Sequence, residues 1–195
     1  MKRVLAFFLA LLPLRAGDRW ALCIEPVELR TETAELLSGS RRTVVCPAKE
    51  DAALGLSRLS KAELAAAGQT FAQCKTKALA AAAAHLKTLK PDIHRSDKGA
   101  AEYAVLKSDS HLTASVVLCP EFLVQLKETF GERLVVMMPD RFTVYVFARS
   151  FGDFQKLGPA IVERFEKATW PVSREAFEIS AEGIKCLGEF QSGGE

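Results

Sequence analysis

Three places in the chain carry residue types that can do chemistry: Cys119 before Pro120, the Asp140-Arg141 pair, and His85. Cys119 occupies the position of a helix N-cap, where Ser, Asp or Asn is the usual residue. The amides at a helix N-terminus stabilise an anion, so a thiol placed there can have a lowered pKa and act as a nucleophile. Cys119 is therefore a candidate catalytic residue of a thiol-dependent enzyme.

A catalytic thiol also needs a base. His111 lies eight residues before Cys119, which is about 25 Å along an extended strand at ~3.3 Å per residue. The base would have to come from His85 or His94 instead. Two other interpretations of Cys119 remain open, a disulfide with Cys186 and a small buried side chain.

Pro139-Asp140-Arg141 separates two apolar runs that almost touch. Pro139 fits the second position of a type I turn and Asp140 the third. Tight hairpins prefer Gly or Asn, and neither is present here. A turn that lacks the usual residues between two buried strands is a place where function can override local preference. We therefore predict Asp140 and Arg141, together with His85, as binding residues.

Other familiar site chemistry is not indicated. Asp92, His94 and Asp97 share one polar loop, but they have no typical metal-ligand spacing. The cysteines and histidines do not have the spacing of a zinc site, and the chain has no G-x-S-x-G, P-loop or dinucleotide motif. The sequence predicts no metal and no cofactor.

The first residues have the layout of a secretory signal peptide. Lys2 and Arg3 precede an uncharged run of eleven residues from Val4 to Leu14, and Ala16 follows. A run of that length is too short to span a bilayer of about 30 Å at 1.5 Å per residue. We expect residues 1–16 to be removed after Ala16. The predicted product is secreted or periplasmic, with no integral membrane segment.

All five cysteines follow the predicted leader. An oxidising compartment permits disulfides, and an odd count leaves at least one thiol outside any intrachain pair. Cys23 and Cys46 flank the first extended segments, so they are the predicted disulfide, provided that their Cα atoms come within about 7 Å.

The net positive charge of the full chain comes from its predicted leader. Without Lys2, Arg3 and Arg15 the formal net charge falls from +2 to −1. The remaining chain has no basic run with interleaved aromatic residues, which is the pattern that contacts phosphate backbones. Nucleic acid is not a predicted partner; the predicted partner is an unidentified protein or small molecule.

Several elements must position the candidate residues. Ser60 and Glu63 form a capping box, and apolar residues then recur at helical spacing up to Pro91. This pattern predicts one long alanine-rich helix with a possible break at Gly68. The further expected helices cover 120–131 and 153–167, the last with a kink or a late start at Gly158-Pro159. The expected strands are 27–31, 43–46, 103–106, 112–118, 134–138, 142–148, 176–180 and 184–190.

The joins between these strands are short, and a short join excludes a parallel crossover. We therefore predict an α+β class with a mostly antiparallel sheet, on which the long helix and two shorter helices pack. With 49% hydrophobic and 26% charged residues, the composition is that of a globular chain. We expect a single domain over residues 17–190 and a flexible tail over 191–195.

A set of short motifs follows the same order along residues 60–190: His85-Leu86 ending an alanine-rich helix, A-S-x-x-L-x-P at 114–120, a valine strand running into P-x-R at 139–141, and P-x-S-x-x-x-F at 171–177. In this order they resemble an uncharacterised bacterial family known only as a domain of unknown function. That family pattern has Asn at the position of His85 and Asp at the position of Phe142. The resemblance implies a compact domain of helices and strands, and it implies no reaction.

Two hypotheses on function follow. The first is an exported, non-enzymatic binding or interaction module that presents a surface formed by loops such as Pro139 to Arg141 and Ile93 to Gly99. The second is a thiol-dependent enzyme that uses Cys119. The first is favoured, because no second catalytic group is placed near Cys119 by the sequence.

Overall fold

The computed structural model describes residues 19–51, 55–151 and 156–191. The predicted leader, most of the predicted tail and residues 153–155 of the third predicted helix lie outside these ranges. The elements are β1 (Trp20–Pro26), η2 (Val27–Leu29), β2 (Glu35–Leu36), β3 (Thr43–Asp51), β4 (Gly55–Arg58), α1 (Lys61–Ala66), α2 (Phe71–Leu86), β5 (Asp92–Arg95), β6 (Ala101–Lys107), η3 (Ala114–Leu118), α3 (Pro120–Phe130), β7 (Leu134–Asp140), β8 (Thr143–Ala148), α4 (Gly158–Lys167), β9 (Glu175–Ser180) and β10 (Gly183–Glu189), where η marks a 3-10 helix.

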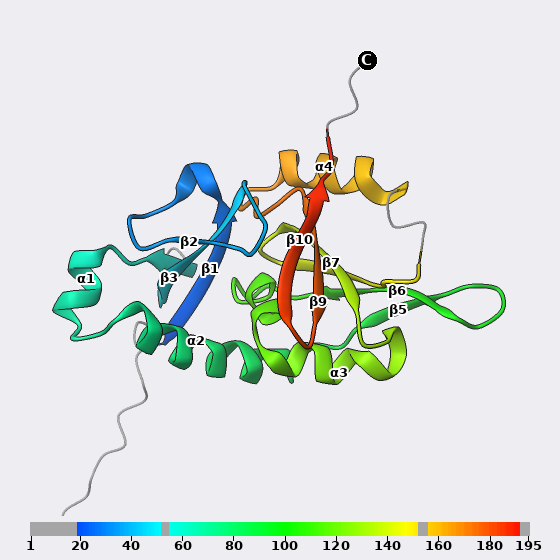
Figure 1. Cartoon of the computed structure of the whole chain (residues 1–195), viewed down its shortest axis with the longest axis horizontal. Coiled ribbons are helices and arrows are strands. Elements are labelled where there is room, and N and C mark those ends of the chain that lie inside the picture. Colours follow the sequence, from blue (N-terminus) through cyan, green and yellow to red (C-terminus); the bar gives the residue numbers. More distant parts are fainter. Residues whose placement is uncertain (1–18, 52–54, 152–155, 192–195) are drawn as a thin grey trace, which may run out of the picture.

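The predicted α+β class is confirmed, but the strands form two sheets rather than one. The smaller sheet has the order β1-β3-β2, with β4 also paired to β3, and the larger has the order β10-β9-β7-β8-β6-β5. Every pairing between these strands is antiparallel. Figure 1 shows the small sheet beside the large one, with α2 and α3 along one side of the molecule and α4 on the opposite side.

The main core is enclosed by both sheets, η3 and the helices α2 and α3, with α2 packed chiefly on β1 and η3. It includes Leu86 of α2, Phe122 of α3, and Val136 and Val146 of the two central strands. A second apolar cluster fills the other face of the large sheet beneath α4, where Met137 and Phe147 meet Ile161. All residues of β7 are buried, and it is apolar up to its last residue, Asp140, so it is a central strand, as predicted.

The predicted long helix is divided at the predicted break. α1 begins with the expected capping box of Ser60 and Glu63, and Gly68 then adopts a φ of +62°, which a glycine adopts without steric cost. Thr70 and Gln73 form a second capping box that starts α2. α3 begins at Pro120, as predicted, and its C-cap is Gly131. α4 takes the late start indicated by Gly158-Pro159.

Three local predictions are wrong. The first strand is Trp20–Pro26, and the predicted strand at 27–31 begins instead as the 3-10 helix Val27–Leu29. The apolar segment 112–118 is not extended, because η3 closes hydrogen bonds of the i to i−3 type, as from the Ser115 amide to the Leu112 carbonyl at 3.0 Å. The polar loop that was expected around His94 contains the edge strand β5.

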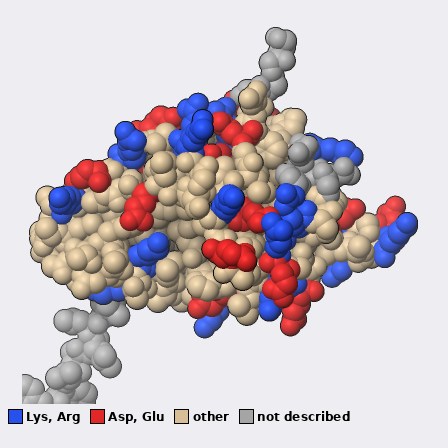
Figure 2. All heavy atoms as spheres, in the orientation of Figure 1, with Lys and Arg blue, Asp and Glu red and all other residues tan. Residues whose placement is uncertain are grey.

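Charges on the visible surface are mixed in sign. Figure 2 shows basic and acidic side chains interspersed across the face in view. Within the part of the chain that the structure describes, no helix combines the length and the apolar character needed to cross a membrane.

Candidate functional site

The turn between β7 and β8 differs from the predicted one. Asp140 pairs with Thr143, so the two loop residues are Arg141 and Phe142, and Pro139 still belongs to β7. The register shifts between Met137 and Asp140, which is the sign of a β-bulge. No residue of this turn needs a positive φ, so the bulge takes over the role that Gly or Asn has in tighter hairpins.

The segment that follows α4 holds this turn in place. The Arg141 amide donates to the Trp170 carbonyl at 3.1 Å, and the amide of Val172 donates to the Pro139 carbonyl at 3.1 Å. Asp140 and Pro171 form an isolated antiparallel bridge. The turn is therefore fixed by long-range backbone pairing, and its two charged residues are presented in defined directions.

Arg141 points into the protein toward the small sheet. Its Nη2 donates to Oε1 of Glu25 on β1, and the two side chains are 5% and 0% exposed. The other carboxylate oxygen of Glu25 accepts from Nη1 of Arg58 at 2.9 Å, and the Cys23 thiol donates to Oε1 at 3.0 Å. The carboxylate of Glu25 therefore compensates a cation that is almost fully withdrawn from water.

Two rings complete the surroundings of Arg141. Its guanidinium carbon lies 4.6 Å from the centre of the Trp170 ring, a cation–π geometry. Its Nη1 lies 3.5 Å from Nδ1 of His111. Because a guanidinium only donates, Nδ1 accepts and the imidazole proton resides on Nε2. Burial, and then the charge of Arg141, lower the pKa of His111, so the neutral ring is favoured.

Asp140 faces the opposite side and orients an arginine of α4. Its Oδ1 accepts from the Phe142 amide at 2.8 Å, and its Oδ2 accepts from Nε of Arg164. Nη2 of Arg164 donates to Oγ1 of the buried Thr143 at 2.7 Å. The side chain of Asp140 is 7% exposed and that of Arg164 is 38% exposed, so the cation is the member of the pair that water or a ligand can reach.

A pocket of about 470 Å³ opens between this turn and α4. We call it the turn pocket. Its lining residues are Asp140, Phe142, Tyr145, Ala160, Glu163, Arg164, Lys167, Ala168, Thr169 and Trp170. Both residues thus contact side chains in the wall of the turn pocket. Asp140 orients Arg164, and Arg141 stacks on Trp170.

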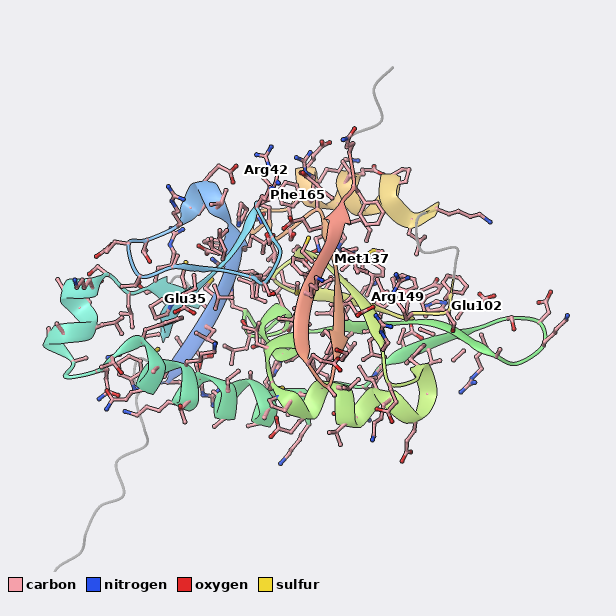
Figure 3. All side chains as sticks on the ribbon, in the orientation of Figure 1. Glu35, Arg42, Glu102, Met137, Arg149 and Phe165 are labelled. Atoms are coloured by element: carbon pink, nitrogen blue, oxygen red, sulfur yellow. The ribbon has the colours of Figure 1, made fainter. Side chains whose placement is uncertain are left out.

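A second polar cluster joins the two sheets. The buried carboxylate of Glu175 accepts from the hydroxyls of Ser40 and Thr43, both at 2.6 Å, and Thr43 is hydrogen-bonded to Ser173 at 2.7 Å. A pocket of about 170 Å³ beside this cluster is lined by Arg42 and Phe165 among others, both labelled in Figure 3. This pocket is much smaller than the turn pocket, and ion pairs of Arg42 with Glu28 and Glu189 surround it.

The structure does not bring His85 to Asp140 and Arg141. His85 lies on α2, where its Nε2 is 3.2 Å from Oγ1 of Thr113 and its Nδ1 is 3.4 Å from Oγ1 of Thr88. Burial lowers the pKa of His85. It is not among the residues that line the turn pocket, so it lies apart from the other two predicted binding residues.

Cys119 is the N-cap residue of α3, as predicted, but its side chain does not cap the helix. Its thiol donates to the Val116 carbonyl at 2.9 Å and the residue is 3% exposed. Burial, and then the charge of Glu121, raise the pKa of Cys119 to about 11. The lowered pKa that a helix N-terminus can give a thiol is not found at Cys119, because burial outweighs the helix amides. Cys119 lines a separate pocket of about 390 Å³ between α3 and the β9–β10 turn.

Cys23 and Cys46 lie directly opposite each other in the register of β1 and β3. Both are buried free thiols, as are Cys74 and Cys119, and Cys186 is a partly buried free thiol. The predicted disulfide is therefore not formed in this structure, and the Cys23 thiol donates to the Glu25 carboxylate instead. Burial raises the pKa of Cys23 and Cys46.

Sequence reasoning missed three residues that build the site: Glu25, Arg164 and Trp170. A signal for Glu25 was present, because it is the only charged residue in the otherwise apolar strand WALCIEP, and a charge in such a strand calls for a buried partner. Arg164 and Trp170 had no local signal, since surface arginines and single tryptophans are common. Among the described residues no group of three or more His, Cys, Asp or Glu side chains could hold a metal ion.

Comparison with protein-family models, with curated proteins and with solved structures gave no match for this chain. The resemblance to a domain of unknown function therefore stays a prediction. The function has to be inferred from the chemistry of the turn pocket.

Proposed function

We propose that this protein is an exported, non-enzymatic binding module that holds a small molecule in the turn pocket. The observation that carries the proposal is a pocket of about 470 Å³ with prepositioned walls. This volume lies within the range of about 300–1,000 Å³ that is typical of small-molecule sites.

The walls are held by contacts that exist before any ligand arrives. The backbone carbonyl of Trp170 accepts a hydrogen bond from the Arg141 amide, and the indole ring of Trp170 stacks on the Arg141 guanidinium. Arg164 is oriented by Asp140 and by Thr143. A site that is already ordered loses less conformational entropy when it binds, which favours affinity.

The lining chemistry suits retention better than turnover. Three aromatic residues and four charged residues face the cavity, whereas Asp140, the buried acid, is engaged by two donors. The alternative, a thiol-dependent enzyme, loses support from the surroundings of Cys119, where a raised pKa opposes the thiolate that attack requires.

Export is proposed on the sequence of residues 1–16, which has the basic, apolar and small-residue regions of a secretory leader. The described chain begins its first strand at Trp20, four residues after the proposed cleavage position. Mass spectrometry of the protein recovered from outside the cytoplasm is expected to show a chain starting near Gly17. Recovery of the uncleaved chain from the cytoplasm alone would contradict export.

Fragment screening by protein-observed NMR tests the binding site itself. Ala160 lies on α4, is exposed and lines the pocket, so Ala160→Phe is expected to fill the cavity without disturbing the core. The matched control is Ala80→Phe, at an exposed position of α2. Fragments should shift the amides around Trp170 and Arg164, and binding should be lost in Ala160→Phe alone. Hits that cluster elsewhere, or that survive Ala160→Phe, would contradict the proposal.

A further inference from the structure

We infer that the ligand of the turn pocket carries a carboxylate attached to a flat, apolar body. This inference rests on the proposed function, and it names the class of molecule that the site would select. Some polar groups of the pocket are already engaged by the protein, and others remain available to a ligand.

The Asp140 member of the Asp140–Arg164 ion pair is buried and already hydrogen-bonded. Both oxygens of Asp140 accept hydrogen bonds, one from the Phe142 amide and one from Arg164. Its side chain is only 7% exposed. A cationic ligand would have to compete with Arg164 and with the Phe142 amide for this carboxylate, which is less favourable than binding to a carboxylate without protein donors.

Arg164, the donor of the same pair, has only some of its N–H groups engaged by the protein. A guanidinium has five N–H groups, and the structure engages Nε with Asp140 and one N–H of Nη2 with Thr143. Arg164 also interacts with Tyr145, which leaves further N–H groups on a side chain that is 38% exposed. A planar guanidinium with free donors is the preferred partner of a carboxylate, because the two can form parallel hydrogen bonds.

The remaining charges at the rim indicate a monoanion. The lining contains two acidic and two basic side chains, so the pocket has no formal excess charge to hold a dianion such as a phosphate monoester. Lys167 is paired with Glu163 at 2.5 Å, and both are well exposed, so this pair contributes little fixed field. Arg164 is left as the one cation with a defined orientation among the lining residues.

The aromatic residues indicate the shape of the rest of the ligand. Phe142, Tyr145 and Trp170 line the same cavity together with the small residues Ala160 and Ala168. Flat apolar groups bind between aromatic side chains with favourable offset or edge contacts. A molecule with an aromatic ring and a carboxylate matches both features of the pocket.

Tryptophan fluorescence gives a direct test. The chain has two tryptophans, and Trp20 lies away from the pocket between Lys49 and Lys77, so Trp20→Phe leaves Trp170 as the only reporter. The probes are benzoate, neutral benzamide and dianionic phenyl phosphate. Benzoate is expected to quench Trp170 saturably and to bind at least tenfold more tightly than either of the other two.

The variant Arg164→Lys keeps a positive partner for Asp140 and removes the planar fork. It is expected to reduce the affinity for benzoate about tenfold, to the level of benzamide. The matched control is Arg149→Gln, an arginine outside the pocket whose partner is Glu178, and it should leave the affinity unchanged.

The outcomes separate this inference from the proposed function. Equal binding of benzoate and benzamide, lost in Ala160→Phe, would overturn the carboxylate assignment and leave the pocket as a binding site. Tighter binding of phenyl phosphate would overturn it in the same way. Failure of these three probes, together with a fragment screen that finds nothing at Trp170, would overturn both.

Discussion

Replacement of Glu25 by Gln removes the charge that compensates Arg141 and preserves the size of the side chain. Glu25 is 0% exposed and the side chain of Arg141 is 5% exposed, so water cannot take over the role of the carboxylate. Leaving one member of a buried ion pair without its partner typically costs about 3–5 kcal/mol. The other neighbours of Arg141 are a neutral imidazole and an indole ring, and neither carries a compensating charge.

Arg58 provides the matched comparison. It donates to the same carboxylate, but its side chain is 38% exposed, so its charge can be hydrated when the contact is lost. Arg58→Gln should therefore reduce the free energy of unfolding by about 1 kcal/mol or less, as surface pairs do. The difference between the two variants isolates the effect of burial.

Urea unfolding with linear extrapolation measures both free energies. We expect Glu25→Gln to lose about 3–5 kcal/mol and the double variant Glu25→Gln/Arg141→Met to recover part of that loss, because it no longer buries an unpaired cation. A loss below about 1 kcal/mol for Glu25→Gln, or one equal to that of Arg58→Gln, would refute the reasoning that burial makes this pair essential.

Three further predictions follow from single contacts. The pKa of His111 is lowered in the folded state, so on acidification the unfolded chain is protonated at this residue before the folded chain. The free energy of unfolding should therefore fall as the pH drops below about 6.5. His111→Gln should flatten this slope, and a rise in stability on acidification would refute the prediction. A Cβ on Gly55 would lie 2.1 Å from the His111 ring at a φ of +75°, whereas Gly99 at +82° has open space. Gly99→Ala should therefore cost about 1–2 kcal/mol and Gly55→Ala clearly more, in the same urea assay; equal costs would show that the ring moves aside. Cys119 should alkylate with iodoacetamide at pH 7 far more slowly than a free cysteine peptide, since its pKa is raised to about 11; rapid alkylation would revive the thiol-enzyme hypothesis.

The sequence was most informative where local signals act alone. α3 lies between Pro120 and Gly131 as its caps predict, and the valine-rich run before Pro139 forms a strand buried along its whole length. Both depend on residues within one element. The predicted strand at 112–118 was wrong because a run of apolar, β-branched residues is compatible with a buried 3-10 turn as well as with a strand. Only the tertiary surroundings of the segment decide between the two.

The sequence did not predict β1, for a related reason. The strand Trp20–Pro26 has five consecutive buried residues, so it lacks the alternation that marks a strand with one solvated face. It also follows directly after the predicted leader, and its last residues were read as part of the next segment. Glu25 therefore lies outside the predicted strand 27–31, and its burial was not predicted.

The site itself was only half predictable. Asp140 and Arg141 stood out because their turn lacked Gly and Asn, and the structure shows long-range pairing in place of local turn chemistry. Their partners are far away in sequence, with Glu25 separated from Arg141 by 116 residues and Arg164 from Asp140 by 24. Contacts over such separations are set by the topology of the two sheets, which no local pattern specifies.

The most direct test of the central claim is a crystal structure of the protein grown with benzoate. The account predicts density for the ring beside Trp170 and Tyr145, with the carboxylate within hydrogen-bond distance of the Arg164 guanidinium. Density confined to the pocket beside Cys119, with the turn pocket filled only by water, would contradict it.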